Sequence, residues 1–419
     1  MLTIGMNSRM KRRPRCLIIP AIKKNAGIPD QLVKKLAGKP LIARALETAL
    51  QVVPPRDILV VTDSDEIRLI CERAGVGCDY DPDQKIQSLD IVSALCPILM
   101  RAAAGYEHLV IYRASSPLVT ARDIEEAYSR FCESGTDRLV TVNSVKCRLW
   151  EKQGGDINAL LFNEAEQTVF VETKSMVMQR SEAMLGGCDR QDGFKTMPHF
   201  LHDRGIEITS YLGWWVCEKI LLSKHIVFVV AGYPAIGMGH IFRALMLAHE
   251  ISDHRVTFLC TRDSELAAAN IAARDYRTRV QRSDDLARDV IELRPDLVVN
   301  DILDTSRAYM EALKAAGLPV VNFEDEGEGA ELADIVVNAL YRDRADADPR
   351  RLTGHRYFCL RDEFLQAQRN EYRPELSRLL LSFGGMDVSD FTRATLDAVF
   401  PLCSRHGTKM RIVTGPGYA

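Results

Sequence analysis

Short runs of β-branched and other apolar residues alternate along this chain with longer amphipathic stretches. In the first half the apolar runs cover residues 16–19, 58–61 and 108–112, and a stretch with helical periodicity follows each of them before the next run begins. Parallel strands need such intervening helices, which return the chain to the same edge of the sheet. The alternation therefore predicts an α/β fold with mostly parallel sheets.

The same alternation begins again in the second half of the chain. Residues 225–230 form a new apolar run, and an amphipathic helical stretch follows over 241–251. Because 419 residues exceed what one hydrophobic core usually organises, we place a domain boundary at 221–224. The predicted parts are a first domain over 14–222, a second over 225–375, and the start of a further lobe over 376–419, which we expect to be truncated.

Residues 145–205 interrupt this rhythm with two Gly-Gly pairs and many polar residues. One interpretation is an irregular insertion. The other is a flap over a site, through which the N-terminal module forms a homodimer. The residues alone favour neither interpretation.

The net charge and the amino-acid composition limit the classes of partner that this protein can bind. A formal net charge of -3 gives no electrostatic basis for nucleic-acid binding. The eleven cysteines contain no Cys-x-x-Cys pair and the nine histidines show no close ligand spacing, so we expect reduced cysteines and no structural metal. The first apolar run ends at Lys23, too early for a signal peptide or a membrane span. We expect a cytoplasmic protein whose partner is a small molecule or a protein.

A glycine-rich turn joins the run that ends at Val230 to the helix that follows. It reads Ala-Ile-Gly-Met-Gly-His-Ile-Phe-Arg over residues 235–243. Gly237 and Gly239 let backbone N–H groups approach a phosphate or sugar, and the positive end of the helix favours an anion. His240 lies at the carboxyl edge of the predicted sheet, where open α/β sheets bind ligands, and it suits a general base. A tight turn with His240 as a capping or surface residue explains the pattern equally well.

This turn, followed by Ala-Leu-Met-Leu-Ala at 244–248, resembles the hydrolase of the pseudaminic acid pathway, which removes UDP from a 2,4-diacetamido-trideoxy sugar. That family has the two-lobed fold of GT-B glycosyltransferases. The resemblance covers residues 226–419 and implies a GT-B N-terminal lobe over 225–375 and the start of the C-terminal lobe over 376–419. Further stretches that keep register with the family are 296–301, 320–325 with 333–338, 357–364 and 382–387.

The resemblance implies that His240 removes a proton from a water, which attacks the anomeric carbon of a UDP-amino sugar with inversion. A histidine suits this step because its ordinary pKa of ~6.5 permits base catalysis near neutral pH. No cofactor is implied. The implied substrate-binding residues are Gly237, Gly239, Arg243, Asp301, Gly384 and Gly385.

Some of these residues have structural explanations as well. Arg243 fits a salt bridge within the fold equally well, and we expect Asp325 to cap a following element rather than to contact substrate. The acidic residue that the family has at the start of its first loop is Ala231 here, and the uridine-binding segment of the second lobe would lie beyond Ala419.

The first half resembles the CMP-sialic acid synthetases, or acylneuraminate cytidylyltransferases, which join CTP to a nonulosonic acid and release pyrophosphate. The residues that carry this resemblance lie at 18–21, 27–29, 36–42, 61–67 and 115–118. It implies a Rossmann-type domain like that of the nucleotide-diphospho-sugar transferases over 14–222, with Mg²⁺ required if the module is active. The implied nucleotide-binding residues are Pro20, Ala21, Lys23, Lys24, Asn25, Asp63, Ser88, Arg113 and Ser116.

The chain differs from this family at positions that the family uses for catalysis and metal binding. The family's Arg-Gly-Gly-Ser-Lys loop is replaced by Ile-Lys-Lys-Asn-Ala at 22–26, and its glutamine before Thr-Ser-Pro is Arg113. Its late metal-binding aspartates align with 209–213, where there is no carboxylate. Mg²⁺ usually needs one or two carboxylates besides phosphate and water. The sequence thus leaves open whether this module is catalytic.

Together these patterns predict an enzyme of nonulosonic acid biosynthesis, of the pseudaminic, legionaminic or sialic type. The second module would release UDP from a UDP-amino sugar, and the first would bind CTP and a nonulosonic acid. Two alternatives remain: a GT-B glycosyltransferase that uses a UDP-amino sugar, and a non-catalytic scaffold that binds nucleotides.

Overall fold

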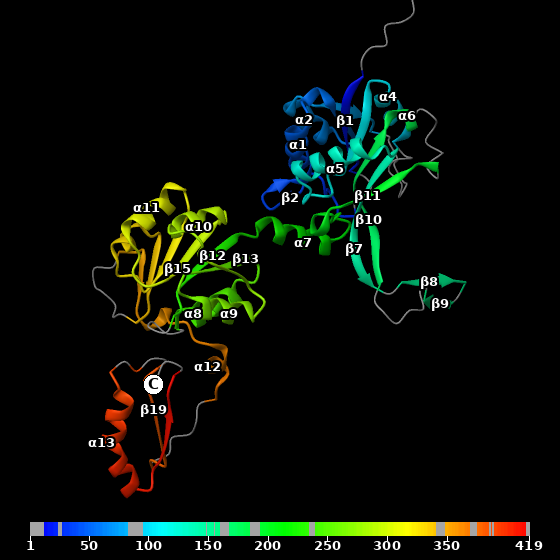
Figure 1. Ribbon diagram of the computed structural model, residues 1–419. Coiled ribbons are helices and arrows are strands. Elements are labelled where there is room, and N and C mark those ends of the chain that lie inside the picture. Colours follow the sequence, from blue (N-terminus) through cyan, green and yellow to red (C-terminus); the bar gives the residue numbers. More distant parts are fainter. Residues whose placement is uncertain are drawn as a thin grey trace, which may run out of the picture. The chain divides into compact units, whose positions relative to one another are not determined.

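The chain divides into two compact units, Met1–Leu222 and Ser223–Ala419 (Figure 1). We refer to them as unit 1 and unit 2 and describe each by itself. The computed structural model describes residues 12–23, 27–82, 95–147, 149–154, 156–159, 167–184, 193–233, 239–340, 348–368, 375–384, 387 and 389–415.

Unit 1 is built on a seven-stranded sheet in the order β11-β7-β10-β6-β1-β4-β5. All neighbouring pairs are parallel except those of β10, which runs antiparallel to β6 and to β7. The mostly parallel α/β prediction is therefore confirmed for this unit. The strands are β1 (Arg13–Ala21), β4 (Ile58–Thr62), β5 (Gly77–Tyr80), β6 (Tyr106–Tyr112), β7 (Arg138–Cys147), β10 (Gln167–Arg180) and β11 (Thr196–Phe200).

Helices cover both faces of this sheet because its central strands are apolar on both sides. Leu17 and Ile19 of β1 face one core with α1 (Leu41–Val52), α2 (Asp65–Ala74) and α5 (Ala121–Ser134). Cys16 and Ile18 face the opposite core with α4 (Cys96–Ala103) and α6 (Ser181–Met184). Such two-sided burial is expected of parallel strands.

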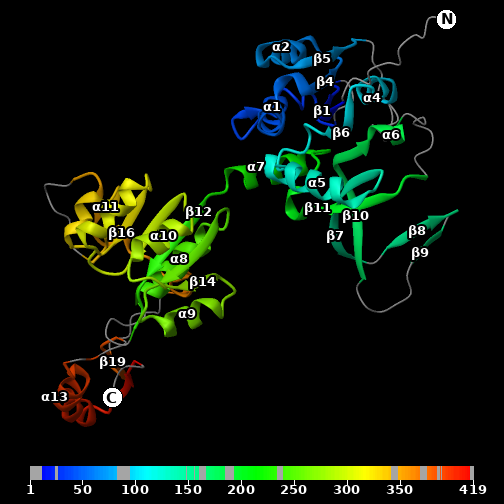
Figure 2. The ribbon, with the colours of Figure 1, turned by 45° about the horizontal axis from the view of Figure 1, so that its top comes forward.

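Strand β10 shows that the segment after residue 145 is more regular than its sequence suggests. Residues 175–179 are fully buried in the middle of the sheet, whereas 168–172 pair with the end of β7 and are mostly exposed. The two strands extend beyond the rest of the sheet near a hairpin of β8 (Trp150–Gln153) and β9 (Asp156–Ala159) (Figure 1 and Figure 2). The irregular-insertion interpretation is therefore wrong for β10 and β11, which are integral strands.

A third, smaller core closes unit 1 and joins its beginning to its end. The segment 206–222, which includes helix α7 (Tyr211–Leu222), places Ile208, Trp214 and Cys217 against apolar side chains from residues 28–41 and Leu118. Gly27 lies directly against this segment: a Cβ added to it would stand 2.4 Å from the backbone oxygen of Thr209.

Unit 2 contains a second seven-stranded sheet, in the order β14-β13-β12-β15-β16-β17-β18. Every neighbouring pair is parallel, as the sequence predicts. The first strand of the unit, β12, lies between β13 and β15, so the chain first builds outward in one direction and then in the other. The strands are β12 (His225–Val230), β13 (Arg255–Cys260), β14 (Arg277–Val280), β15 (Leu297–Asp301), β16 (Val320–Phe323), β17 (Ile335–Asn338) and β18 (Arg351–Thr353).

This order places helices on both faces of the unit 2 sheet. α8 (Gly239–Glu250) and α9 (Glu265–Ala272) pack on one face, and α10 (Leu286–Glu292) and α11 (Arg307–Ala315) on the other. The change of face follows the change of direction between β12 and β15, as in doubly wound folds. Further along the chain, β19 (Arg378–Ser382) and β20 (Lys409–Val413) pair in parallel and are connected by α13 (Phe391–Arg405).

Besides the strands of 145–205, the sequence pattern misses the short strands β5, β14 and β18, each at an edge of its sheet. Edge strands are commonly short and rich in charged residues, so they lack a clear apolar pattern. The cysteines of the described ranges are free, as expected, with the exception of Cys96, which is disulfide-bonded. The spacing of cysteines in a sequence does not show which thiols meet in space. None of the helices in the described ranges has the length and apolar character that a membrane span needs.

The close approach at Gly27 gives a test of the third core. We expect Gly27→Ala to lower the free energy of unfolding of unit 1 by about 1–3 kcal/mol, because the added methyl group meets a backbone atom that has no room to move. The three tryptophans, at 150, 214 and 215, all lie in unit 1, so denaturant unfolding followed by tryptophan fluorescence reports on this unit alone.

Gly213→Ala is the matched control, since its Cβ would meet nothing nearer than 3.6 Å. Alanine also favours the helix by up to about 1 kcal/mol. Equal unfolding midpoints for the two variants would contradict the proposed contact.

Candidate active site

The candidate site of unit 2 lies where its strand order reverses. The chain leaves β12 toward β13 and leaves β15 toward β16, although β12 and β15 are neighbours in the sheet. The connections after two such strands diverge, and open α/β sheets bind their ligands in the resulting crevice at the carboxyl ends. His240 follows β12 at the start of α8, and Asp301 is the last residue of β15.

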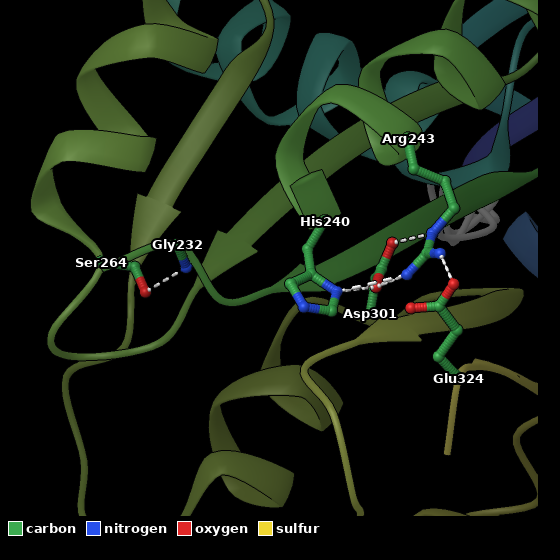
Figure 3. A network of polar contacts seen from close by, with 6 residues as sticks. All are labelled: Gly232, His240, Arg243, Ser264, Asp301 and Glu324. Carbon is green, nitrogen blue, oxygen red and sulfur yellow. Dashed lines mark hydrogen bonds and ion pairs between the residues drawn. The ribbon is translucent and has the colours of Figure 1, made fainter. Parts of the chain in front are cut away.

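His240 is buried, with 8% of its surface exposed, and its ring contacts the carboxylate of Asp301. The Nδ1 atom lies 2.6 Å from Asp301 Oδ1 (Figure 3). An ionised carboxylate only accepts hydrogen bonds, so Nδ1 carries the proton and donates it. The other ring nitrogen, Nε2, is then left with a lone pair when the imidazole is neutral. This tautomer is the one that a general base requires.

Arg243, one helical turn after His240, fixes the same carboxylate from a second direction. Its Nε donates to Asp301 Oδ2 at 2.8 Å and its Nη2 to Oδ1 at 2.6 Å. Nη2 also lies 3.2 Å from His240 Nδ1, but both atoms carry protons, so this is a contact between two donors that share one acceptor. The two bonds to Asp301 form the bidentate pairing in which an arginine holds a carboxylate rigidly.

The third nitrogen of the Arg243 guanidinium, Nη1, donates to Glu324, which follows β16. Burial alone would lower the pKa of Arg243, but the hydrogen bonds and charges of Asp301 and Glu324 outweigh it and raise that pKa above its ordinary value. The guanidinium carbon also lies 5.2 Å from the centre of the Phe323 ring. Every polar group of this arginine is therefore used within the fold, as the salt-bridge interpretation of Arg243 anticipated.

Glu324 has a backbone φ of +51°, in the left-handed region that non-glycine residues seldom adopt. Its N–H donates to the carbonyl of Val337 on the neighbouring strand. A strained residue persists only where the surrounding structure fixes it, and such residues cluster at functional sites.

A cavity of about 410 Å³ opens beside this network. His240 and Arg243 lie on one wall, and most of the remaining wall is aromatic or aliphatic. Among its members is Cys359, whose pKa is raised by burial although Arg243 opposes the shift. The lining residues are Gly239, His240, Phe242, Arg243, Met246, Phe323, Glu324, Ala339, Leu340, Tyr357, Phe358, Cys359, Leu360, Arg361 and Phe364.

Asp325 plays a structural part next to this site. Its fully buried carboxylate accepts hydrogen bonds from the backbone N–H groups of Thr305 and Gly327 and from the Thr305 hydroxyl and the Asn322 amide. These bonds tie the loop after β16 to the loop after β15. Asp325 therefore holds the backbone on either side of the site. It does not cap the helix that follows, at 328–332, whose N-cap residue is Gly327, so the expected capping role is replaced by this link between loops.

The predicted glycines lie at different places in unit 2. Gly239 begins α8 and lines the cavity, and a Cβ added there would meet nothing within 4 Å. Gly384 follows β19 with a φ of +84°. Gly237 and Gly385 lie outside the described residues.

In unit 1 the strand order reverses at β1 and β6, which are neighbours although the chain leaves them in different directions. Pro20 and Ala21 end β1 and are buried. The backbone N–H of Lys23 donates to Asp63, which follows β4, at 2.7 Å. The Lys23 ammonium lies 3.0 Å from Asp30 and 3.2 Å from Glu66, and these carboxylates raise its pKa.

Arg113 follows β6, and its guanidinium forms an ion pair with Glu207, which also accepts from the Ser115 hydroxyl at 3.1 Å. Only 16% of either charged side chain is exposed. Ser116 is fully buried, and its hydroxyl has no hydrogen-bond partner among the described residues. The other predicted nucleotide contacts, Lys24, Asn25 and Ser88, lie outside the described residues.

A family model described as cytidylyltransferase matches residues 16–194. Because of this similarity, we refer to residues 16–194 as the cytidylyltransferase region. The match ends before β11, the edge strand of this sheet, and does not reach unit 2.

Named relatives of the chain include enzymes that make CMP-linked nonulosonic acids. The chain is 29% identical to the N-acylneuraminate cytidylyltransferase of Streptococcus agalactiae over 32% of this chain and 33% of that protein. It is 24% identical to the CMP-N,N'-diacetyllegionaminic acid synthase of Legionella pneumophila over 49% of this chain and 94% of that protein. An uncharacterized protein of Methanocaldococcus jannaschii is 24% identical over 46% of this chain and 43% of that protein. The chain thus spans less than half of the archaeal and streptococcal relatives.

A solved structure with which the chain compares is a CMP:2-keto-3-deoxy-manno-octonic acid synthetase complexed with CTP. The two share 13% identity over 50% of this chain and 98% of that chain, with a TM-score of 0.38. A likeness this weak adds nothing to the sheet order, on which the α/β assignment of the cytidylyltransferase region rests.

A requirement for Mg²⁺ in the cytidylyltransferase region stays a prediction. Magnesium usually takes one or two carboxylates together with phosphate and water. In the described ranges, no group of three or more His, Cys, Asp or Glu side chains could hold a metal ion. Glu207, the carboxylate nearest to 209–213 in the sequence, is paired with Arg113, and Asp63 accepts a hydrogen bond from Lys23.

The structure also brings in partners that sequence reasoning overlooked. Glu324 and Glu207 were not singled out, because each pairs with an arginine far away in the sequence: 81 residues separate Arg243 from Glu324 and 94 separate Arg113 from Glu207. The position of Glu324 directly after an apolar run was the one available signal. It is shared by many residues that simply cap loops.

The buried pairing of Asp301 predicts a large effect on stability. We expect Asp301→Asn to lower the free energy of unfolding of unit 2 by roughly 3 kcal/mol, because it removes one partner of a buried ion pair and leaves the other in place. The measurement is calorimetry. All tryptophans lie in unit 1, so an unfolding transition that calorimetry detects and tryptophan fluorescence does not is assigned to unit 2.

Asp348→Asn serves as the control. Asp348 pairs with Arg350 in the same unit, but half of the arginine side chain is exposed, at 52%. Exposed pairs contribute at most about 1 kcal/mol. Similar losses in the two variants would contradict a buried, tightly paired Asp301.

Proposed function

We propose that unit 2 hydrolyses a UDP-linked amino sugar with release of UDP, as a step in nonulosonic acid biosynthesis. The observation that carries the proposal is the His240–Asp301 pair, which places the imidazole of His240 beside a cavity at the carboxyl edge of a parallel sheet. The resemblance of residues 226–419 to the pseudaminic acid pathway hydrolase, a GT-B-type protein, supports the same reaction.

The geometry suggests how the reaction proceeds. Nε2 of His240 accepts a proton from a water while the water oxygen forms a bond to the anomeric carbon. The bond from that carbon to the phosphate oxygen breaks, and UDP leaves with the bonding electron pair. The imidazolium is stabilised through Nδ1 by Asp301, and it returns its proton to solvent before the next cycle. Attack opposite the leaving group inverts the configuration.

The cavity suits such a substrate because most of its lining is apolar. Aromatic and aliphatic walls limit the number of waters around the base, so that one water placed beside His240 competes with few others. The names of the relatives of unit 1 connect that unit to CMP-linked nonulosonic acids, which supports a place for both units in one pathway. A homodimer through unit 1 stays a prediction.

Replacement of the base should abolish the reaction while the fold persists. We expect His240→Gln to slow release of UDP from a UDP-amino sugar by about 10²–10⁴-fold, the usual contribution of a general base. The measurement is UDP release without an added acceptor, followed by a coupled assay.

His249→Gln is the matched control, because His249 lies on the same helix but is exposed and does not line the cavity. It should retain full activity. Unchanged UDP release in His240→Gln would refute the catalytic assignment, and UDP release that depends on an acceptor sugar or lipid would favour the glycosyltransferase alternative.

For unit 1, we infer binding of CTP without transfer of its nucleotide. The cytidylyltransferase match and the relatives favour CTP as the ligand. The pairing of Arg113 with Glu207, and the departures from the family sequence at 22–26 and 209–213, argue against nucleotidyl transfer.

Removal of metal tests this inference. We expect calorimetric titration to show CTP binding that persists in a chelator, and no pyrophosphate when Mg²⁺ and a nonulosonic acid are added. ATP, which differs in its base, is the control and should bind more weakly. Pyrophosphate release with Mg²⁺ would contradict the inference and establish transferase activity, whereas a failure to bind CTP would remove the nucleotide-binding role.

A further inference from the structure

Four ionisable side chains form one connected cluster beside the cavity of unit 2: His240, Arg243, Asp301 and Glu324. When the imidazole is neutral, the cation of Arg243 offsets one of the two carboxylates, and the cluster carries one net negative charge. Protonation of His240 brings it to neutrality. Glu324 contributes the excess charge although it does not touch His240.

We propose that Glu324 is a positioning residue, which acts through Arg243 to orient Asp301 and to keep His240 basic enough to accept a proton from water. The proposal rests on the hydrolysis proposed above and extends it to a residue outside the catalytic pair. The carboxylate of Asp301 is shared with the guanidinium that binds it bidentately, so Glu324 supplies the second negative charge of the cluster.

The hydrogen-bond geometry supports a relay of orientation. Arg243 donates through Nε and Nη2 to Asp301 and through Nη1 to Glu324. A planar guanidinium held at both ends cannot rotate, so the Asp301 carboxylate stays in the plane that Nδ1 of His240 needs. Figure 3 shows the order of contacts from Glu324 through Arg243 to Asp301 and His240.

The backbone at Glu324 supports a functional role as well. A positive φ at a residue other than glycine carries a cost in stability, yet the position holds a long charged side chain. The side chain is only 15% exposed, so its charge is poorly screened by water.

The remaining polar groups around His240 do not duplicate this charge. Besides the cluster itself, the described titratable groups on the cavity wall come from the segment after β18. They are Tyr357, Cys359 and Arg361. At neutral pH these three lining residues add one cation and no carboxylate, which makes the negative charge of Glu324 more important for an imidazolium at His240.

Glu324→Gln keeps the length of the side chain and removes its charge. The imidazolium then loses a stabilising negative charge, so the pKa of His240 falls and the acidic limb of the pH–rate profile moves to lower pH by about 0.5–1 unit. We expect kcat to fall about tenfold, by analogy with the loss of outer partners of metal-binding histidines. A merely structural role would lower the rate without moving the limb.

Two further variants separate charge from fold. Glu324→Asp restores the charge, and aspartate tolerates a left-handed φ better than most residues, so it should move the acidic limb back toward its original position. Glu328→Gln removes an exposed carboxylate a few residues further along the same segment and should leave both the rate and the limb unchanged. Thermal unfolding confirms that each variant is folded.

The titration of His240 by NMR gives a readout that does not need turnover. The signal is assigned by its loss in His240→Gln, and its pKa should be lower in Glu324→Gln than in the unchanged protein and in Glu328→Gln. An unchanged His240 titration in Glu324→Gln would overturn the inference even if UDP is released. Absence of UDP release by the unchanged protein would instead overturn the proposed function, with the inference about basicity still decided by the titration.

Discussion

The buried carboxylate of Asp301 is the group on which the candidate site of unit 2 depends. It accepts the Nδ1 proton of His240 and two protons of Arg243, and it is almost fully buried, at 1% exposed. A carboxylate in such a place is stable only if its partners are fixed, because a buried charge without a partner costs several kcal/mol, roughly 3–5. The three side chains depend on one another: the carboxylate of Asp301 fixes the tautomer of His240, and the guanidinium of Arg243 fixes the orientation of that carboxylate.

The topology of the sheet brings these groups together. Asp301 ends β15, Glu324 follows β16, and His240 and Arg243 lie on the first turns of α8, which follows β12. In a parallel sheet all strands end at the same edge, so three segments that are distant in the sequence meet there. Polar links behind this edge, such as those made by Asp325, hold the loops in register. The rigidity of the site therefore comes from the sheet and its loops.

The sequence predicted the central parts of the fold because their residues are apolar in a strict rhythm. The runs at β1, β4, β6, β12, β15 and β16 all became buried strands, and Gly75 and Gly135 end helices in the left-handed conformation that favours glycine. Strand β10 was obscured, since its exposed half pairs beyond the sheet and polar residues such as Thr173 and Lys174 stand in its middle. The resemblance of the glycine turn to a known family predicted that His240 is a site residue. The contacts of His240 with Asp301 and of Arg243 with Glu324 could not be predicted, because no local sequence pattern specifies which charged residues meet across strands.

The third core of unit 1 bears on how the two halves of this protein can be separated. The cytidylyltransferase match ends at residue 194, yet Ile208, Trp214 and Cys217 complete the packing around Ile28 and Leu36. A gene fragment cut at the end of the match would leave an apolar surface open to water and invite aggregation. A cut after Leu222 keeps α7 with the core that it stabilises, so a fragment of the first half must extend past residue 194 to the end of this helix.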